Sequence, residues 1–328
     1  MMYVGTSNIS FGLILKEMDT LATDVGYKYV RQRKSGVRDN FKVITAVVDR
    51  MDFFDKIRSN QDFKMNGYVM YVSKTSFVVG IDMYRKNQDE DWKFIGNASY
   101  ILAARTMDDK PYKVPQLSFT GEQDLIQCKT RFEYGYHVQA DSKANKGFSQ
   151  YKSSPTDDES AEIHDLLFAL HQQRQFSVEE RRAFVPIEKT ANSSYVLIQP
   201  QMNVFGNLSS GGYILKEAFD LSWLTGHLFC ERMKFQFVGL DRLYYTTPVE
   251  LGSGYELTSK VAFTDEDYFR VNTSIQNIVP SQQNSTTEFN FTFKFPEGMG
   301  KRKRIMPSNY DDALTYLMNK RMLNKFLF

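Results

Sequence analysis

Apolar residues recur at helical spacing near the start of the chain. Between Gly12 and Val30 they stand mostly three or four positions apart, which predicts one long helix with an apolar face. The segments that follow are rich in Val, Ile, Tyr and Phe and are separated by polar turns, a pattern typical of an antiparallel meander. The predicted strands of this meander are Lys42–Phe53, Phe63–Ser73, Ser76–Arg85 and Trp92–Arg105.

The same order of elements returns after Ser193. A predicted strand over Tyr195–Gln199 comes before a long apolar helix over Gly211–Phe229. Further extended segments and a closing helix come after it. They are expected at Lys234–Tyr245, Gly254–Phe263, Tyr268–Gln276, Thr286–Phe295 and, for the helix, from Tyr310 to about Lys325.

The stretch between these two parts, residues 106–190, has a different character. Runs of Ser, Lys, Gln and Asp predict a long connector. A helix is expected after Pro155, where Asp157 or Asp158 can cap a stripe of Ile and Leu, and a short helical run is expected around Val178–Arg182. Connectors of this length are usually functional or disordered, so a surface for a partner protein is one hypothesis.

Three short sequences of the first part recur in the second, in the same order and at similar spacing. The matches are GLILKEM from Gly12 with GYILKEA from Gly212, VDRM from Val48 with LDRL from Leu240, and Gly67-Tyr68 with Gly254-Tyr255. One short match could arise by chance, whereas three in register indicate a duplicated unit. Each half is predicted to be one helix covered by a curved sheet, and the two halves to pair as a pseudo-dimer. Sites are then expected where each half contributes a helix end.

Composition limits the classes of protein that fit. The 328 residues suffice for two ordinary domains, and 42% hydrophobic with 24% charged residues is a globular balance. A net charge of +2 gives no basic excess for nucleic acid, and no apolar run reaches the roughly 20 residues of a membrane span. The four histidines form no HExxH pair, and Cys128 and Cys230 do not suit a disulfide scaffold or a zinc site. These features argue against a metalloenzyme and favour a reducing compartment.

The two helix segments resemble a known family. The run NVFGNLSSGGYILKEAFDLSWLTGHLF at Asn203–Phe229, with ISFGLILKEMDTLATDVGYKY near the start and VVDRMDF after it, resembles the double-hotdog acyl-CoA thioesterases, above all the mitochondrial long-chain type. The resemblance implies an α+β tandem (double) hotdog, in which each half is a long helix wrapped by a curved antiparallel sheet. The implied parts are hotdog domains at 1–106 and 191–300, a partly helical connector at 107–190 and a helical tail at 301–328.

This resemblance implies a thioester hydrolase that converts acyl-CoA and water into free fatty acid and coenzyme A. In such sites one half supplies an Asn just before its Gly-Gly helix, and the other supplies a carboxylate about two turns into its own helix. Asn203 and Asp19 match these positions. The equivalent positions of the opposite halves hold Val4 and Phe219, so one complete site is expected. Asp220 follows Phe219 but is rotated by about 100° around the helix.

Each matching residue has an implied role. Asp19 would be the general base that deprotonates water, with attack by its own carboxylate as the less favoured route. The N–H groups of Gly211 and Gly212 lie at a helix N-terminus and are candidates for an oxyanion hole. Asn203 would position the water or the carbonyl, or would only cap the helix, and Asn207 competes with it because the loop before Gly211 is one residue longer than usual. Coenzyme A enters only as part of the substrate, and no other cofactor and no metal is expected.

Other functions stay open beside hydrolysis. The same fold could serve as a catalytically weak scaffold or accessory subunit of a larger mitochondrial assembly, which the irregular loop and the long connector favour. A dehydratase on this fold would need a His near the start of a helix, and none stands close to Gly12 or Gly211. The resemblance also implies a mitochondrial location, with the cytoplasm as alternative since no transit segment is evident, and a homo-oligomer or larger protein assembly.

Overall fold

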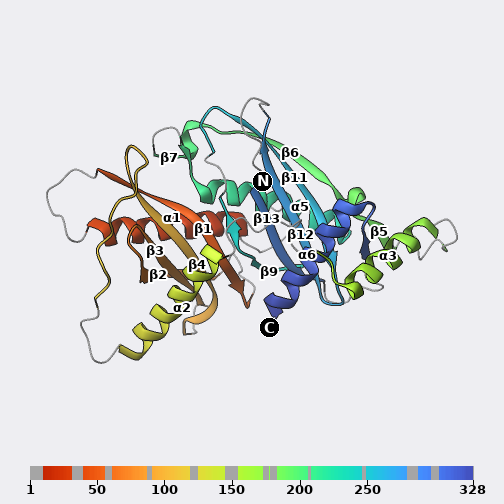
Figure 1. Cartoon of the computed structure of the whole chain (residues 1–328), viewed down its shortest axis with the longest axis horizontal. Coiled ribbons are helices and arrows are strands. Elements are labelled where there is room, and N and C mark those ends of the chain that lie inside the picture. The colour runs from red at the N-terminus through yellow and green to blue at the C-terminus, as the bar shows by residue number, and fades with distance from the viewer. Residues whose placement is uncertain are drawn as a thin grey trace. The chain divides into compact units, whose positions relative to one another are not determined.

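The computed structural model groups the chain into two compact units. It describes residues 10–31, 40–55, 61–86, 91–118, 125–144, 154–172, 177, 183–205, 208–245, 249–278, 287–296 and 303–327. Unit 1 contains Met1–Lys146, Gln199–Lys216 and Arg242–Leu251, and unit 2 contains Gly147–Ile198, Glu217–Asp241 and Gly252–Phe328. Each unit holds an antiparallel sheet and a long helix, as the tandem hotdog prediction requires (Figure 1).

Unit 1 is built on the helix α1 (Phe11–Arg31) and an antiparallel sheet in the strand order β2-β3-β4-β1. The short strand β10 (Leu243–Tyr244) pairs with β1. The bounds of the long strands are β1 Phe41–Phe53, β2 Asp62–Val72, β3 Ser76–Lys86 and β4 Lys93–Thr106. Every end lies within one residue of its predicted position, so the first helix and its meander are confirmed.

The helix α1 lies on one face of this sheet. Its apolar positions Leu15 and Met18 are fully buried, because side chains three or four residues apart share one face of a helix. Gly26 marks a close approach to the strands. A Cβ atom at Gly26 would come within 2.7 Å of the Phe77 ring and 3.1 Å of Val43, so a glycine is needed there.

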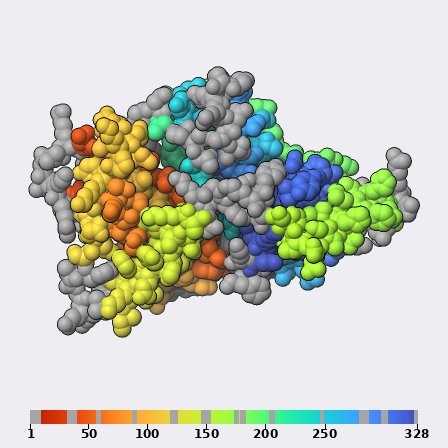
Figure 2. Space-filling model, in the orientation of Figure 1, coloured from red at the N-terminus to blue at the C-terminus, as the bar shows by residue number. Residues whose placement is uncertain are grey.

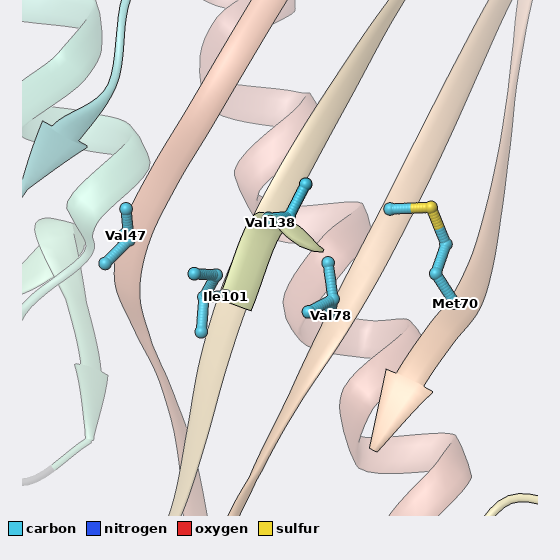
Figure 3. Close-up of a cluster of buried hydrophobic side chains, with 5 residues drawn as sticks. All are labelled: Val47, Met70, Val78, Ile101 and Val138. Carbon is cyan, nitrogen blue, oxygen red and sulfur yellow. The ribbon is translucent and has the colours of Figure 1, made fainter. Parts of the chain in front are cut away.

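The helix α2 (Leu125–Ala144) covers the opposite face of the same sheet, where the sequence predicted only connector. Polar and apolar residues are mixed around this helix, so its pattern has no clear helical period and the prediction missed it. Val138 of α2 packs on one buried residue from each strand: Val47, Met70, Val78 and Ile101. Figure 3 shows this cluster on the near face of the sheet with α1 behind the strands, and Figure 2 shows α2 at the surface of unit 1.

Unit 2 repeats the plan around the helix α5 (Gly211–Phe229), whose predicted bounds are confirmed. Residues of α5 up to Lys216 group with unit 1 and the rest with unit 2. The sheet of unit 2 has the strand order β9-β13-β12-β11-β6. The bounds are β6 Asn192–Leu197, β9 Gln236–Leu240, β11 Gly254–Thr264, β12 Tyr268–Asn277 and β13 Thr287–Lys294.

The predicted strand Lys234–Tyr245 is interrupted after β9. Asp241 and Arg242 lie between β9 and β10 and carry charges that need partners. In unit 2 the Asp241 carboxylate pairs with the fully buried Arg270, and in unit 1 Arg242 pairs with Asp49. The strand therefore breaks at two neighbouring charged residues, of which Asp241 has its partner within unit 2 and Arg242 has its partner within unit 1.

The helix expected in the connector is confirmed as α3 (Asp157–His171), but its cap differs from the prediction. The N-cap is Thr156 rather than Asp157 or Asp158. The Thr156 side chain accepts a hydrogen bond from the Glu159 N–H, and the Glu159 side chain accepts one from the Thr156 N–H. This reciprocal pair satisfies two N–H groups at once, which an aspartate one or two positions later does not achieve.

Shorter elements complete the described part of the chain. The closing helix is confirmed as α6, and the predicted run at Val178–Arg182 lies outside the described residues. No described helix is at once long and apolar enough for a bilayer. The remaining bounds are α6 Tyr310–Leu327, β5 Phe184–Pro186, β7 Asn203–Phe205, β8 Leu208–Ser209, β14 Arg304–Met306, and the 3₁₀ turns Ile187–Thr190 and Pro200–Met202.

Val138→Ala tests whether α2 is held by its contact with the sheet. Removing two buried methyl groups should lower the free energy of unfolding by about 1–3 kcal/mol, because the cluster cannot close the space. Ile126→Ala on the same helix is the matched control, since Ile126 is 83% exposed and its loss should change stability by about 0.5 kcal/mol or less. Urea unfolding measures both, and equal effects would contradict the docking of α2.

Candidate active site

The carboxylate of Asp19 is the most heavily bonded acidic group on α1. Asp19 lies about two turns into the helix and is 3% exposed. Its Oδ1 accepts a 2.8 Å hydrogen bond from the Thr45 hydroxyl on β1. Its Oδ2 accepts a 2.8 Å hydrogen bond from the backbone N–H of Gly212 and lies 3.4 Å from the Ser210 hydroxyl. The structure therefore brings Asp19 directly to the start of α5, inside unit 1.

Burial and hydrogen bonding act in opposite directions on this carboxylate. Burial raises the pKa of Asp19 above its usual value of 3.8, while the hydrogen bonds from Thr45, Gly212 and Ser210 lower it. Burial has the larger effect. The first N–H groups of a helix lack partners within the helix, and its dipole favours negative charge there, so α5 offers Asp19 a complementary end.

The two glycines at the start of α5 permit this close contact. A Cβ atom on Gly212 would lie 2.7 Å from the Asp19 Cβ and 3.0 Å from the Lys16 carbonyl oxygen. A Cβ atom on Gly211 would lie 2.9 Å from the ring of Tyr245, whose hydroxyl donates a 2.8 Å hydrogen bond to the Gly211 carbonyl. Any larger residue at either position would push α5 away from α1 or from Tyr245.

The Gly212 N–H, expected to contribute to an oxyanion hole, is bonded to Asp19 in this structure. It can bind a substrate oxygen only by changing partner or by sharing its hydrogen between two acceptors. The carboxylate therefore stands at the very place where the helix dipole would stabilise a developing negative charge.

Asn203 lies in the β7–β8 hairpin that leads into α5. Its backbone pairs with Ser209, and the neighbouring Ser210 N–H donates a 3.0 Å hydrogen bond to the Met202 carbonyl. The hairpin thus holds the Asn203 backbone beside the residues that begin α5. The Asn203 side chain and the whole of Asn207 lie outside what the structure describes, so the choice between these two amides stays a prediction.

Sequence reasoning did not select four polar residues that lie around Asp19. Thr45 and Ser210 bond to its carboxylate, and Tyr245 bonds to Gly211. Tyr100 on β4 is fully buried, and the Asp19 charge is among the causes that raise the pKa of its hydroxyl. Thr45 interrupts an apolar run of β1, but its place beside Asp19, like that of Tyr100, depends on strand register, which the sequence pattern does not supply.

The position equivalent to Asp19 in the second repeat is filled by an aromatic ring. Phe219 is 1% exposed and contacts Phe237 and Phe291 at ring-centroid distances of 4.8 and 5.5 Å. This position belongs to the apolar core of unit 2. Among the described residues, no three His, Cys, Asp or Glu side chains are grouped as a metal site would require.

Comparison with known proteins gives a consistent relationship. The model of the thioesterase superfamily matches residues 7–91. The chain is 26% identical to acyl-coenzyme A thioesterase 9, mitochondrial, of Homo sapiens, covering 97% of this chain and 72% of that protein. It is also 26% identical to acyl-coenzyme A thioesterase 10, mitochondrial, of Mus musculus, with the same coverage.

The fold agrees with this relationship. The structure is similar to that of a putative oleoyl thioesterase from Lactobacillus plantarum, with a TM-score of 0.51 at 8% identity, over 88% of this chain and 90% of that one. The predicted tandem hotdog fold and the predicted resemblance are both confirmed. Residues 7–91 thus match the thioesterase superfamily, and nearly the whole chain is similar in sequence to mitochondrial acyl-CoA thioesterases.

Proposed function

We propose that this chain hydrolyses acyl-CoA thioesters to a free acid and coenzyme A, with Asp19 as the general base. The observation that carries the proposal is the buried Asp19 carboxylate against the start of α5, in a chain whose relatives are named acyl-CoA thioesterases. A carboxylate beside a helix N-terminus combines a proton acceptor with a positive dipole end, which are the two requirements of thioester hydrolysis.

The reaction needs one proton transfer in each direction. Asp19 accepts a proton from water while the water oxygen attacks the thioester carbon, and the carbonyl oxygen becomes an oxyanion near the start of α5. When the intermediate collapses, the carbon–sulfur bond breaks and the proton passes from Asp19 to the sulfur of coenzyme A. Water is consumed, and Asp19 ends in its starting form.

Burial suits Asp19 to this role. A raised pKa makes a carboxylate a stronger base than an exposed one, and the hydrogen bonds from Thr45 and Gly212 favour its ionised form. Thr45 also fixes the direction of Oδ1. The alternative route, in which Asp19 itself attacks and forms an anhydride, would release the acid in a second step with water.

The amide of Asn203 completes the proposed site by orienting the water or the carbonyl. The Asn203 backbone lies next to the start of α5, which supports a direct role in the site rather than a role away from it. Gly211 contributes a backbone N–H at the same helix end, and the Gly212 N–H, which bonds to Asp19, can contribute only by changing partner or by sharing its hydrogen. Following the names of its relatives, we further propose a mitochondrial location.

Asp19→Asn should lower kcat for coenzyme A release by about 10²–10⁴-fold, because the amide cannot accept the proton of water. A thiol reagent with a series of acyl-CoA chain lengths measures the release. Asp24→Asn is the matched control: it removes an exposed carboxylate from the same helix and should leave kcat unchanged. Wild-type protein that is inert toward every acyl-CoA, or that purifies within a larger assembly, would favour the scaffold function instead.

Asn203→Ala and Asn207→Ala distinguish the two candidate amides. Loss of a hydrogen bond to a charged transition state should lower kcat/KM of the Asn203→Ala variant by about 10- to 100-fold. The Asn207→Ala variant should stay near wild type. The same thiol assay compares them at subsaturating acyl-CoA, and a larger loss in the Asn207→Ala variant would transfer the role to Asn207.

Asp19→Asn should also make the protein more stable near neutral pH. Burial raises the pKa of Asp19 in the folded state, so its protonated form stabilises the fold below its usual pKa of 3.8, and that contribution is lost as the pH rises through the folded-state pKa. Asparagine does not ionise, so the variant keeps this stabilising contribution as the pH rises. The difference in Tm between variant and wild type, measured by calorimetry, should therefore grow as the pH rises from the usual value of 3.8 through the folded-state pKa of Asp19. A variant that is less stable than wild type at pH 7 would contradict this.

A further inference from the structure

The hydroxyl of Tyr100 is a buried polar group without a hydrogen-bond partner in the part of the chain that the structure describes. Tyr100 lies on β4 and is 0% exposed, and its hydroxyl oxygen has no hydrogen-bond partner among the described residues. Nearly all buried polar groups in folded proteins are hydrogen-bonded. An isolated buried hydroxyl is therefore unfavourable for stability, and a bound molecule can supply the missing partner.

Tyr100 faces α1, on the same side of the sheet as Asp19. It pairs across the sheet with Val79, two residues beyond Phe77 on the strand β3. Alternate residues of a strand share a face, and Phe77 contacts α1 at Gly26. Its neighbour Ile101 points the other way, into the cluster beneath α2 (Figure 3).

The internal repeat gives both Thr45 and Tyr100 a counterpart in the second half of the chain. The repeat aligns Val48 with Leu240, so Thr45 corresponds to Phe237 three residues earlier. Val48 pairs with Tyr100 across the sheet of unit 1, and Leu240 pairs with Phe291 across the sheet of unit 2. Sheet register therefore makes Tyr100 the counterpart of Phe291.

Each of these positions is polar in the first repeat and phenylalanine in the second. In unit 2 the three phenylalanines contact one another, with ring-centroid distances of 4.8, 5.5 and 6.2 Å. In unit 1 two of the counterparts are hydrogen-bonded to each other. The pairs are Asp19 with Phe219, Thr45 with Phe237 and Tyr100 with Phe291. Tyr100 is thus the third member of a polar group of which the carboxylate is the centre.

The pKa of Tyr100 agrees with this placement and identifies its hydroxyl as a hydrogen-bond donor. Burial raises the pKa of Tyr100 well above its ordinary value of 10.0, and the charge of Asp19 raises it further, followed by Tyr245. The hydroxyl therefore keeps its proton at all pH values at which an enzyme works. It can donate that proton in a hydrogen bond but cannot act as a base.

We propose that the Tyr100 hydroxyl binds substrate at this site by donating a hydrogen bond to the thioester carbonyl oxygen. The proposal rests on the hydrolysis proposed above and assigns a further catalytic residue to it. The oxyanion that forms on this oxygen needs preorganised donors, and the Gly212 N–H is engaged by Asp19. Tyr100 supplies a donor that no other described group uses.

Tyr100→Phe tests this role with little change in shape. Losing one donor to the oxyanion should lower kcat by about 10²-fold or more with little change in KM, because the bond strengthens mainly in the transition state. The variant should melt at the wild-type temperature or higher, since it removes a hydroxyl that has no partner in the described part of the chain.

Tyr29→Phe is the matched control. Its hydroxyl donates a 2.9 Å hydrogen bond to the Pro115 carbonyl, so this variant should lose some thermal stability and keep the wild-type kcat. An active wild type with unchanged kcat in Tyr100→Phe would overturn the role of Tyr100 and leave the hydrolase function standing. A lowered kcat that accompanies a lowered Tm would indicate a structural hydroxyl and would also overturn it. Wild-type protein without activity on any acyl-CoA would overturn both proposals together.

Discussion

The hydrogen bond from the Gly212 N–H to the Asp19 carboxylate constrains the rest of the proposed site. It joins the middle of α1 to the first turn of α5, and it therefore restricts which residues fit at both positions. Gly212 must lack a side chain, because a Cβ atom would collide with Asp19 and with the α1 backbone. Thr45 completes the coordination of the carboxylate from the sheet. N–H and O–H donors surround this buried carboxylate and favour its ionised form, while burial acts against them and raises its pKa.

The two repeats show two solutions for the same positions of one fold. The second repeat fills them with Phe219, Phe237 and Phe291 and gains a dry aromatic core. The first repeat keeps a carboxylate and two hydroxyls there, at a cost in stability that burial of polar groups entails. Duplication allows this division, because one copy of the core can hold the fold while the other carries reactive groups. We therefore propose one site of this chemistry in the described repeats rather than two.

Much of the fold follows from sequence because the pattern is strong where one face is buried. The bounds of α5 and the four long strands of unit 1 could be read from apolar spacing, and the resemblance to the thioesterase family selected Asp19 by its place after Gly12. The helix α2 could not, since its contact with the sheet depends on tertiary packing rather than on an apolar stripe. Tyr100 and Thr45 were also beyond reach. Their relation to Asp19 depends on strand register and on which face of the sheet meets α1, and only the structure supplies these.

A crystal structure of the protein with a non-hydrolysable acyl-CoA analogue would test the account most directly. The carbon that replaces the thioester carbonyl should lie next to the Asp19 carboxylate at the start of α5, with room for one water molecule between them. An analogue whose reactive carbon binds elsewhere, with the Asp19 carboxylate still sealed between Thr45 and Gly212, would contradict the assignment of Asp19 as the base.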